Sequence, residues 1–119
     1  MGKMTKAKVE NIAEDLGWSV RFETQKDSRG ETEKYVEFSQ DSPAGEDFSF
    51  YVFYGKLPEI PTEVYRYWQD FNIEEHVKMW LEAKSNGVRG VPDIVTLVDD
   101  AREIETMIEN LWEELKEGA

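Results

Sequence analysis

The 119-residue chain contains no cysteine and a single histidine. Without cysteine the chain has no disulfide, zinc–thiolate site, iron–sulfur cluster or thiol nucleophile, and this composition suits a reducing cytoplasm. A metalloprotease-type helix needs a second histidine one turn from the first, and Trp80 stands one turn after His76. We therefore expect no metal and no cofactor, and we interpret His76 as a packed or surface side chain rather than a catalytic one.

Basic residues and long apolar runs are also scarce. The chain has 14 Lys and Arg against 26 Asp and Glu, and its formal net charge is -12. Direct nucleic-acid binding neutralises phosphates with Lys and Arg, so this composition argues against it. No apolar run reaches the roughly 18 residues of a membrane span, and no signal-peptide pattern is present. These absences indicate a cytoplasmic protein whose partners are basic surfaces or cations.

The length and the aromatic content favour one folded domain over residues 1–119. Folded domains commonly have about 100–150 residues. The 6 Phe, 5 Tyr and 4 Trp supply large apolar areas, so a hydrophobic core can form despite the charge.

The first half of the chain predicts one helix followed by three strands. Apolar positions within residues 5–16 have helical spacing, and Gly17 is suited to end that helix in a left-handed conformation. Residues 18–23, a segment around residues 36–38, and residues 48–54 then alternate apolar and polar side chains, which is typical of half-buried strands. The short connections at 26–30 and 41–45 favour an antiparallel meander over parallel pairing.

The second half predicts three helices. Pro61 suits a first helical turn, and Asn72 is a natural N-cap for the next helix, which residues 86–87 end. We expect Val77, Trp80, Leu81 and Ala83 to face inward. A connection at 87–91 leads to Pro92 and a last helix of about 24 residues. Its apolar positions recur at alternating steps of three and four: Ile94, Leu97, Ala101, Ile104, Ile108, Leu111 and Leu115.

These elements define an α+β fold: a three-stranded antiparallel meander packed against helices, in the order α-β-β-β-α-α-α. We expect helices to cover the face of the sheet that carries the even-numbered side chains. The heptad-like spacing of the last helix also fits a coiled coil. We favour packing within the chain, and therefore a monomer, over a helix-mediated homodimer.

The loop between the second and third strands is a candidate site. Asp41, Ser42, Glu46 and Asp47 supply oxygen atoms, which calcium and magnesium prefer as ligands. The spacing does not match an EF-hand loop, and Asp, Ser, Pro and Gly are the residues that tight connections use. We favour a structural loop, with a binding surface as the second interpretation.

The acidic last helix is the other candidate. Residues 93–117 contain nine acidic residues and two basic ones. At 100° per residue, Asp99, Glu103, Glu113 and Glu117 lie opposite the apolar stripe, along about 27 Å of helix. With Glu109 they form a candidate interaction surface. A line of carboxylates can imitate a nucleic-acid backbone and enter a cationic channel, although acidic helix faces also simply keep small proteins soluble.

A longer pattern resembles a known group of proteins. It comprises FSQDSPAGEDFSF at residues 38–50, then Asp70-Phe71, Glu75-His76, Met79-Trp80, Gly87-Val88, Gly90-Val91-Pro92 and the acidic last helix. Across roughly residues 34–115 the chain is similar to a family of small acidic proteins from gut bacteria, their phages and mobile elements. The resemblance implies that genomic setting and no catalytic residues. Small acidic proteins in such genomes include inhibitors of CRISPR and restriction systems.

The leading functional hypothesis is a non-enzymatic interaction protein from a phage or mobile element. It would bind a basic, nucleic-acid-handling host protein through a DNA-mimicking acidic surface, as an anti-CRISPR or anti-restriction inhibitor does. One alternative is a small-ligand or cation-binding domain that uses the 41–47 loop and the His76 helix. The other is a homo-oligomeric accessory protein.

Overall fold

The computed structural model describes residues 4–85 and 94–118, and its order of elements confirms the predicted α+β fold. A single 3₁₀ turn at Leu57–Glu59, which the sequence did not predict, leads into the first of the three later helices. The helices and strands are α1 (Lys6–Asp15), β1 (Ser19–Lys26), β2 (Thr32–Asp41), β3 (Asp47–Tyr54), α2 (Ile60–Asp70), α3 (Ile73–Ser85) and α4 (Ile94–Gly118).

The sheet is the predicted antiparallel meander, with β2 between β1 and β3. Its register places Phe22, Val36 and Val52 side by side across the three strands. Because successive side chains of a strand point to opposite faces, the even-numbered residues share one face and the odd-numbered residues share the other. In β3 every even-numbered residue is buried and every odd-numbered residue is exposed, as the alternation predicted.

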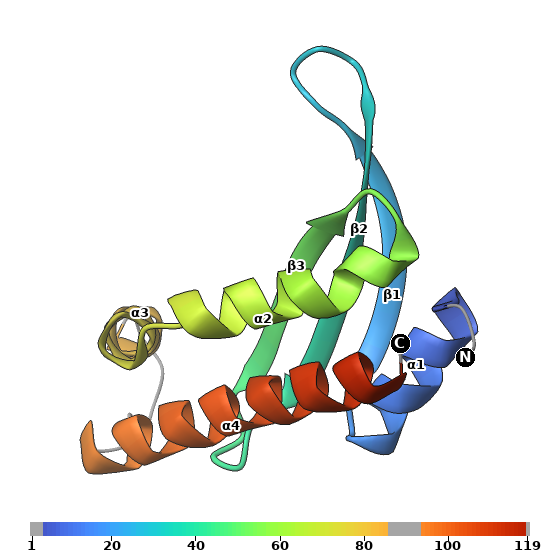
Figure 1. The fold of residues 1–119 in the computed structure, drawn as a ribbon. Helices are drawn as coiled ribbons and strands as arrows, with labels where there is room; N and C mark the ends of the chain where they lie inside the picture. Colours follow the sequence, from blue (N-terminus) through green and yellow to red (C-terminus); the bar gives the residue numbers. More distant parts are fainter. Residues whose placement is uncertain (1–3, 86–93, 119) are drawn as a thin grey trace.

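The helices of the described chain cover one face of this sheet. Figure 1 shows α2 and α4 crossing in front of the strands, α1 beside β1, and α3 beyond the β3 side. The β1–β2 hairpin extends past the helices as a free arm. Helix α4 contacts α1, α2 and α3, so it links the other helices.

The core forms where α4 and α2 meet the even-numbered face. Trp18 is 2% exposed, and its ring lies 5.6 Å from that of Phe50 and 6.4 Å from that of Phe38. Helices α2 and α4 also meet through parallel rings, because Trp68 stacks on Trp112 at 5.9 Å. The apolar stripe of α4 is almost entirely buried: Leu97, Ala101, Ile104, Ile108, Leu111 and Leu115.

The burial of this apolar stripe explains the heptad-like spacing of α4. The stripe packs against residues of the same chain, namely the sheet and α1, α2 and α3. A coiled coil through this stripe would expose the core, so the spacing reflects packing within the chain. The predicted packing within the chain is therefore present, and the monomer stays a prediction.

Local signals at the helix ends are confirmed. Gly17 has φ +91° after α1, in the left-handed region that glycine adopts without strain, and the amide of Trp18 donates to the carbonyl of Ala13 at 2.9 Å. The side chain of Asn72 accepts from the amide of Glu75 at 3.0 Å, which caps α3. Pro61 lies in the first turn of α2.

One predicted core position is wrong. Ile94, the first residue of the apolar pattern, is 61% exposed, and so is its neighbour Val95 at 66%. The first turn of α4 extends past the sheet toward α3 (Figure 1), where, among the described apolar residues, a second and smaller cluster of Val77, Trp80, Leu97 and Ala101 is buried. Ile94 therefore has no sheet residue to pack against.

Several predictions lie outside the described residues. They are the end of α3 at residues 86–87, the connection at 87–91, Pro92 at the start of the last helix, the Gly90-Val91-Pro92 part of the family resemblance, and the inward side chain of Ala83. Among the helices that are described, none combines the length and apolar character needed to cross a bilayer.

We predict that Ile108→Ala destabilises the fold strongly, because Ile108 is 0% exposed at the centre of the core. Truncation of such a side chain should lower the free energy of unfolding by about 2–5 kcal/mol. Asn110→Ala, at an exposed position of the same helix, should change it by less than about 0.5 kcal/mol. Urea unfolding followed by circular dichroism measures both. Equal effects would contradict the assigned orientation of α4.

Candidate functional site

The 41–47 loop is a tight connection that continues the alternation of the strands. Asp41 and Asp47 are the last pair of the β2–β3 register. The amide of Ser42 donates to the carbonyl of Glu46 at 2.8 Å, and Gly45 has φ +87°. Because the side-chain direction still alternates, Ser42 is directed to the helix side while Asp41 is exposed.

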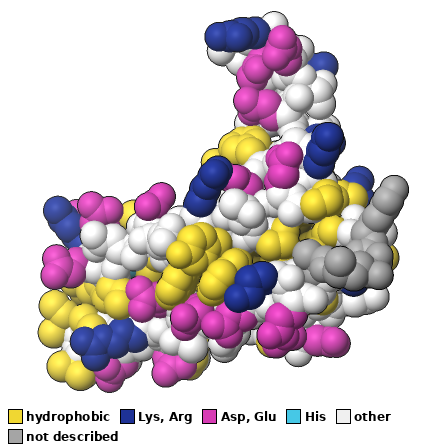
Figure 2. Space-filling model, in the orientation of Figure 1, with side chains coloured by type: hydrophobic (Ala, Val, Ile, Leu, Met, Phe, Trp, Pro, Cys, Tyr) yellow, Lys and Arg dark blue, Asp and Glu magenta, His cyan; other side chains and the backbone are white. Residues whose placement is uncertain are grey.

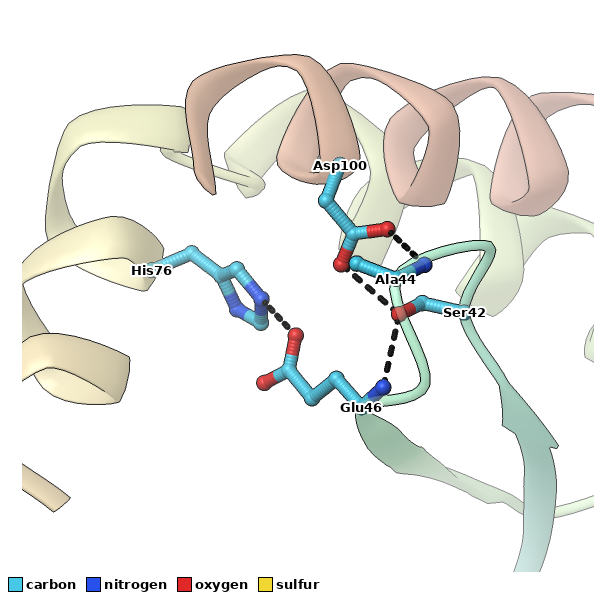
Figure 3. A network of polar contacts seen from close by, with 5 residues as sticks. All are labelled: Ser42, Ala44, Glu46, His76 and Asp100. Carbon is cyan, nitrogen blue, oxygen red and sulfur yellow. Dashed lines mark hydrogen bonds and ion pairs between the residues drawn. The ribbon is translucent and has the colours of Figure 1, made fainter. Parts of the chain in front are cut away.

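Ser42 and Asp100 join this loop to α4. The Ser42 hydroxyl donates to Oδ2 of Asp100 at 2.7 Å, and the amide of Ala44 donates to Oδ1 at 2.9 Å (Figure 3). Asp100 is only 3% exposed and Ser42 only 5%. A buried carboxylate is costly unless hydrogen bonds satisfy its oxygens, and here each oxygen accepts one. The two bonds therefore stabilise an otherwise unfavourable burial.

Glu46 and His76 join the same loop to α3. Nε2 of His76 lies 2.9 Å from Oε2 of Glu46, and the two side chains are 11% and 16% exposed. The imidazole packs at 5.7 Å from the ring of Phe48 and 5.3 Å from that of Phe71. The structure thus places His76 as a packed side chain with one carboxylate partner.

We call Ser42, Ala44, Glu46, His76 and Asp100 the loop clamp. The Ser42 hydroxyl both donates to Asp100 and accepts from the Glu46 amide at 3.0 Å, and the imidazole contacts Glu46 rather than Ser42. A nucleophilic serine needs an adjacent base and access to substrate. Ser42 is buried and lacks that access. Its bond to Asp100 holds the loop against α4, and the contact between Glu46 and His76 holds it against α3.

Tyr67 lies next to the loop clamp and adds no acid–base group at neutral pH. Its ring stacks on that of Phe50 at 4.4 Å. Burial raises the pKa of Tyr67 above the ordinary tyrosine value, because the phenolate would lose its hydration. Tyr67 therefore stays neutral and contributes ring packing.

The four candidate residues of the loop separate into two pairs. Ser42 and Glu46 are engaged in the loop clamp, whereas Asp41 and Asp47 are exposed on the other side of the sheet. Within residues 4–85 and 94–118, no group of three or more His, Cys, Asp or Glu is arranged to hold a metal ion. This geometry favours the structural interpretation of the loop.

The predicted acidic line on α4 is largely present. Asp99, Glu103, Glu113 and Glu117 are exposed, and Glu109 is half-buried on the flank of the helix. Figure 2 shows the acidic side chains along the lower edge of the molecule, where Figure 1 places α4. Exposed Thr106 and Asn110 occupy the middle turns. The line therefore consists of two carboxylate pairs with a neutral segment between them.

These four carboxylates form no ion pair within the described chain, although Arg102 and Lys116 lie on the same helix. None of its ion pairs involves α4; they join Arg21, Arg66 and His76 to acidic residues of β1, β2, α2 and the 41–47 loop. Like charges four residues apart on a helix destabilise it by roughly 0.2–0.5 kcal/mol per pair. Each pair therefore contributes repulsion, which Arg102 and Lys116 offset only in part because neither forms an ion pair with it.

Sequence reasoning missed the role of Asp100, which it counted with the surface acids. A signal was available, because Asp100 precedes the buried Ile104 by four residues and so lies on the same side of α4. The partner could not be found in this way. Ser42 is 58 residues away in the chain, and only the fold brings the two side chains together.

No protein-family model, no curated protein and no solved structure gives a significant match to the chain. The family resemblance over roughly residues 34–115 therefore stays a prediction.

We predict that Asp100→Asn lowers the free energy of unfolding by about 1–3 kcal/mol, because it weakens the two hydrogen bonds to a buried carboxylate. The neighbouring Asp99→Asn is the matched control, since Asp99 is exposed, and should change it by less than about 0.5 kcal/mol. Urea unfolding measures both variants.

A double-mutant cycle isolates the hydrogen bond between Ser42 and Asp100. If the loop clamp acts as described, Ser42→Ala should lower the free energy of unfolding much less in the Asp100→Asn background than in the wild type, because the two residues share one hydrogen bond. Additive effects of the two substitutions would contradict the assignment.

Proposed function

We propose that this chain is a non-enzymatic interaction protein that binds a basic, nucleic-acid-handling protein through the exposed carboxylates of α4. The observation that carries this proposal is the pair of acidic clusters, Asp99 with Glu103 and Glu113 with Glu117, on the side of α4 that faces away from the core. The family resemblance would place the partner among CRISPR or restriction enzymes, and the absence of cysteine suits an encounter in the cytoplasm.

The arrangement on α4 supports recognition of a surface that normally binds nucleic acid. Within each pair the carboxylates are four residues apart, about 6 Å along the helix, and the full line spans about 27 Å. Such a rigid, linear array can occupy a cationic groove. The net charge of -12 would accelerate the encounter by long-range attraction.

The geometry favours this proposal over the cation-binding alternative. The loop residues of that alternative point to opposite sides of the sheet, and two of them belong to the loop clamp. The α4 carboxylates, in contrast, are exposed and form no ion pair within the described chain. They are therefore free to meet an external cationic surface.

We predict that Asp99→Lys, Glu103→Lys and Glu113→Lys, introduced together, weaken binding to a cognate basic nuclease by roughly tenfold or more, because they reverse charges at the contact. A panel of purified CRISPR and restriction nucleases, tested by surface plasmon resonance over a salt series, provides the measurement. Binding should weaken with salt, and duplex DNA should compete for the same site.

The matched control reverses three exposed acids elsewhere in the chain: Glu14, Asp15 and Glu31. This variant has the same net charge as the α4 variant, so any difference between the two reports position rather than total charge. Equal weakening by both triple variants, or binding that duplex DNA does not displace, would contradict the proposal.

A further inference from the structure

The side of the sheet that faces away from the helices is uncovered in the described chain. We call it the open face. It consists of the odd-numbered residues of the three strands: Ser19, Arg21, Glu23, Gln25, Glu33, Tyr35, Glu37, Ser39, Asp41, Asp47, Ser49, Tyr51 and Phe53. In Figure 1 α2 and α4 lie in front of the strands, so the open face is directed away from the acidic line of α4.

Three aromatic rings form a cluster on the open face. Tyr35 lies 5.5 Å from Tyr51 and 5.8 Å from Phe53, and the rings of Tyr51 and Phe53 are perpendicular at 5.5 Å. Tyr51 is 53% exposed and Phe53 is 39% exposed. Aromatic rings supply large contact areas in interfaces, and their faces attract cations. This cluster is therefore suited to a partner that is both apolar and cationic.

Carboxylates surround the aromatic cluster. The open face carries five acidic residues and one basic residue. Arg21 already pairs with Glu37 at 3.1 Å and with Glu23 at 3.5 Å. At the other end Asp41 and Asp47 stand directly opposite each other, and no ion pair of the described residues involves either. Like charges directly opposite in a sheet are destabilising, so this pair favours a cation between them.

We propose that the open face binds an extended, arginine-bearing segment of a partner protein. One guanidinium stacks on Tyr51 and Phe53, and a second is held between Asp41 and Asp47. Arginine fits both positions because its planar group stacks on aromatic rings and pairs bidentately with carboxylates.

The spacing along β3 specifies the segment further. Tyr51 and Asp47 are four residues apart on one face, which is about 14 Å at roughly 3.4 Å per residue. An extended partner chain with arginines four residues apart presents both side chains on the same side at the same separation. The expected recognition element is therefore two arginines with three intervening residues.

Charge also decides between this partner and a second copy of the chain. A symmetric dimer through the open face would bring two surfaces together that each carry five acids and one base. Like charges brought into contact oppose association. A cationic segment is complementary to the same surface.

This inference goes beyond the proposed function, because it concerns a surface on the opposite side of the sheet from the α4 carboxylates. The probe is a short synthetic peptide with two arginines separated by three serine and threonine residues. The same peptide with two lysines is its charge-matched control. Titration of the isotopically labelled protein, followed by amide chemical shifts, locates the contact and gives the affinity.

The arginine peptide should shift amides of β2 and β3 and bind several times more tightly than the lysine peptide. Tyr51→Thr and Phe53→Thr should each weaken its binding roughly two- to fivefold without a change in net charge. Threonine is common in strands, so both variants are expected to keep the sheet. The matched pair Asp41→Asn with Asp47→Asn should weaken binding more than Glu113→Gln with Glu117→Gln.

Three results would overturn the inference. The first is equal affinity for the arginine and lysine peptides, and the second is an equal effect of the two charge-removing pairs; either would indicate general attraction to an acidic protein. The third is a dimeric mass in light scattering that Tyr51→Thr converts to a monomer, because a second copy would then occupy the face. Charge reversal on α4 should leave the sheet shifts in place, so the two proposals can fail separately.

Discussion

The burial of the apolar stripe of α4 sets the direction of the other side chains of this helix and anchors the helices on one face of the sheet. Ile104, Ile108 and Leu115 are 0% exposed against the even-numbered face of the sheet and the neighbouring helices. Once one side of a helix is buried, the direction of its remaining side chains is set by the 3.6-residue period. The acidic residues opposite the stripe must then face solvent. The sheet uses one face for this contact and leaves the other uncovered by the described helices.

The 41–47 loop connects the two sides of the molecule. Its even-numbered residues reach the helices, where Ser42 binds Asp100 and Glu46 binds His76. Its odd-numbered ends, Asp41 and Asp47, terminate the open face. One short segment therefore joins α3 and α4 to the end of the sheet and also positions a carboxylate pair on the opposite surface. The adjacent acids Glu46 and Asp47 therefore have different roles, as Asp99 and Asp100 also do on α4.

The net charge of -12 is divided between surfaces of different geometry. On α4 the carboxylates form a line without aromatic residues among them, which suits a groove that accepts a nucleic-acid backbone. On the open face they surround Tyr35, Tyr51 and Phe53, which suits individual cationic side chains. Long-range attraction depends on the total charge, whereas selection of a partner depends on these local arrangements.

The sequence by itself determined the features that follow from local rules: the period-two strands, the glycine that ends α1, the Asn72 cap and the apolar stripe of α4. Each depends on side chains within a few residues of one another. Only the tertiary structure decided which acids are surface charges, that Ile94 lies beyond the sheet, and that Ser42 and Glu46 point away from Asp41 and Asp47. Those outcomes depend on contacts between distant segments, such as the bond between Ser42 and Asp100 across 58 positions. Periodicity assigns a residue to a face, but the partner of that face is set by the packing of the whole chain.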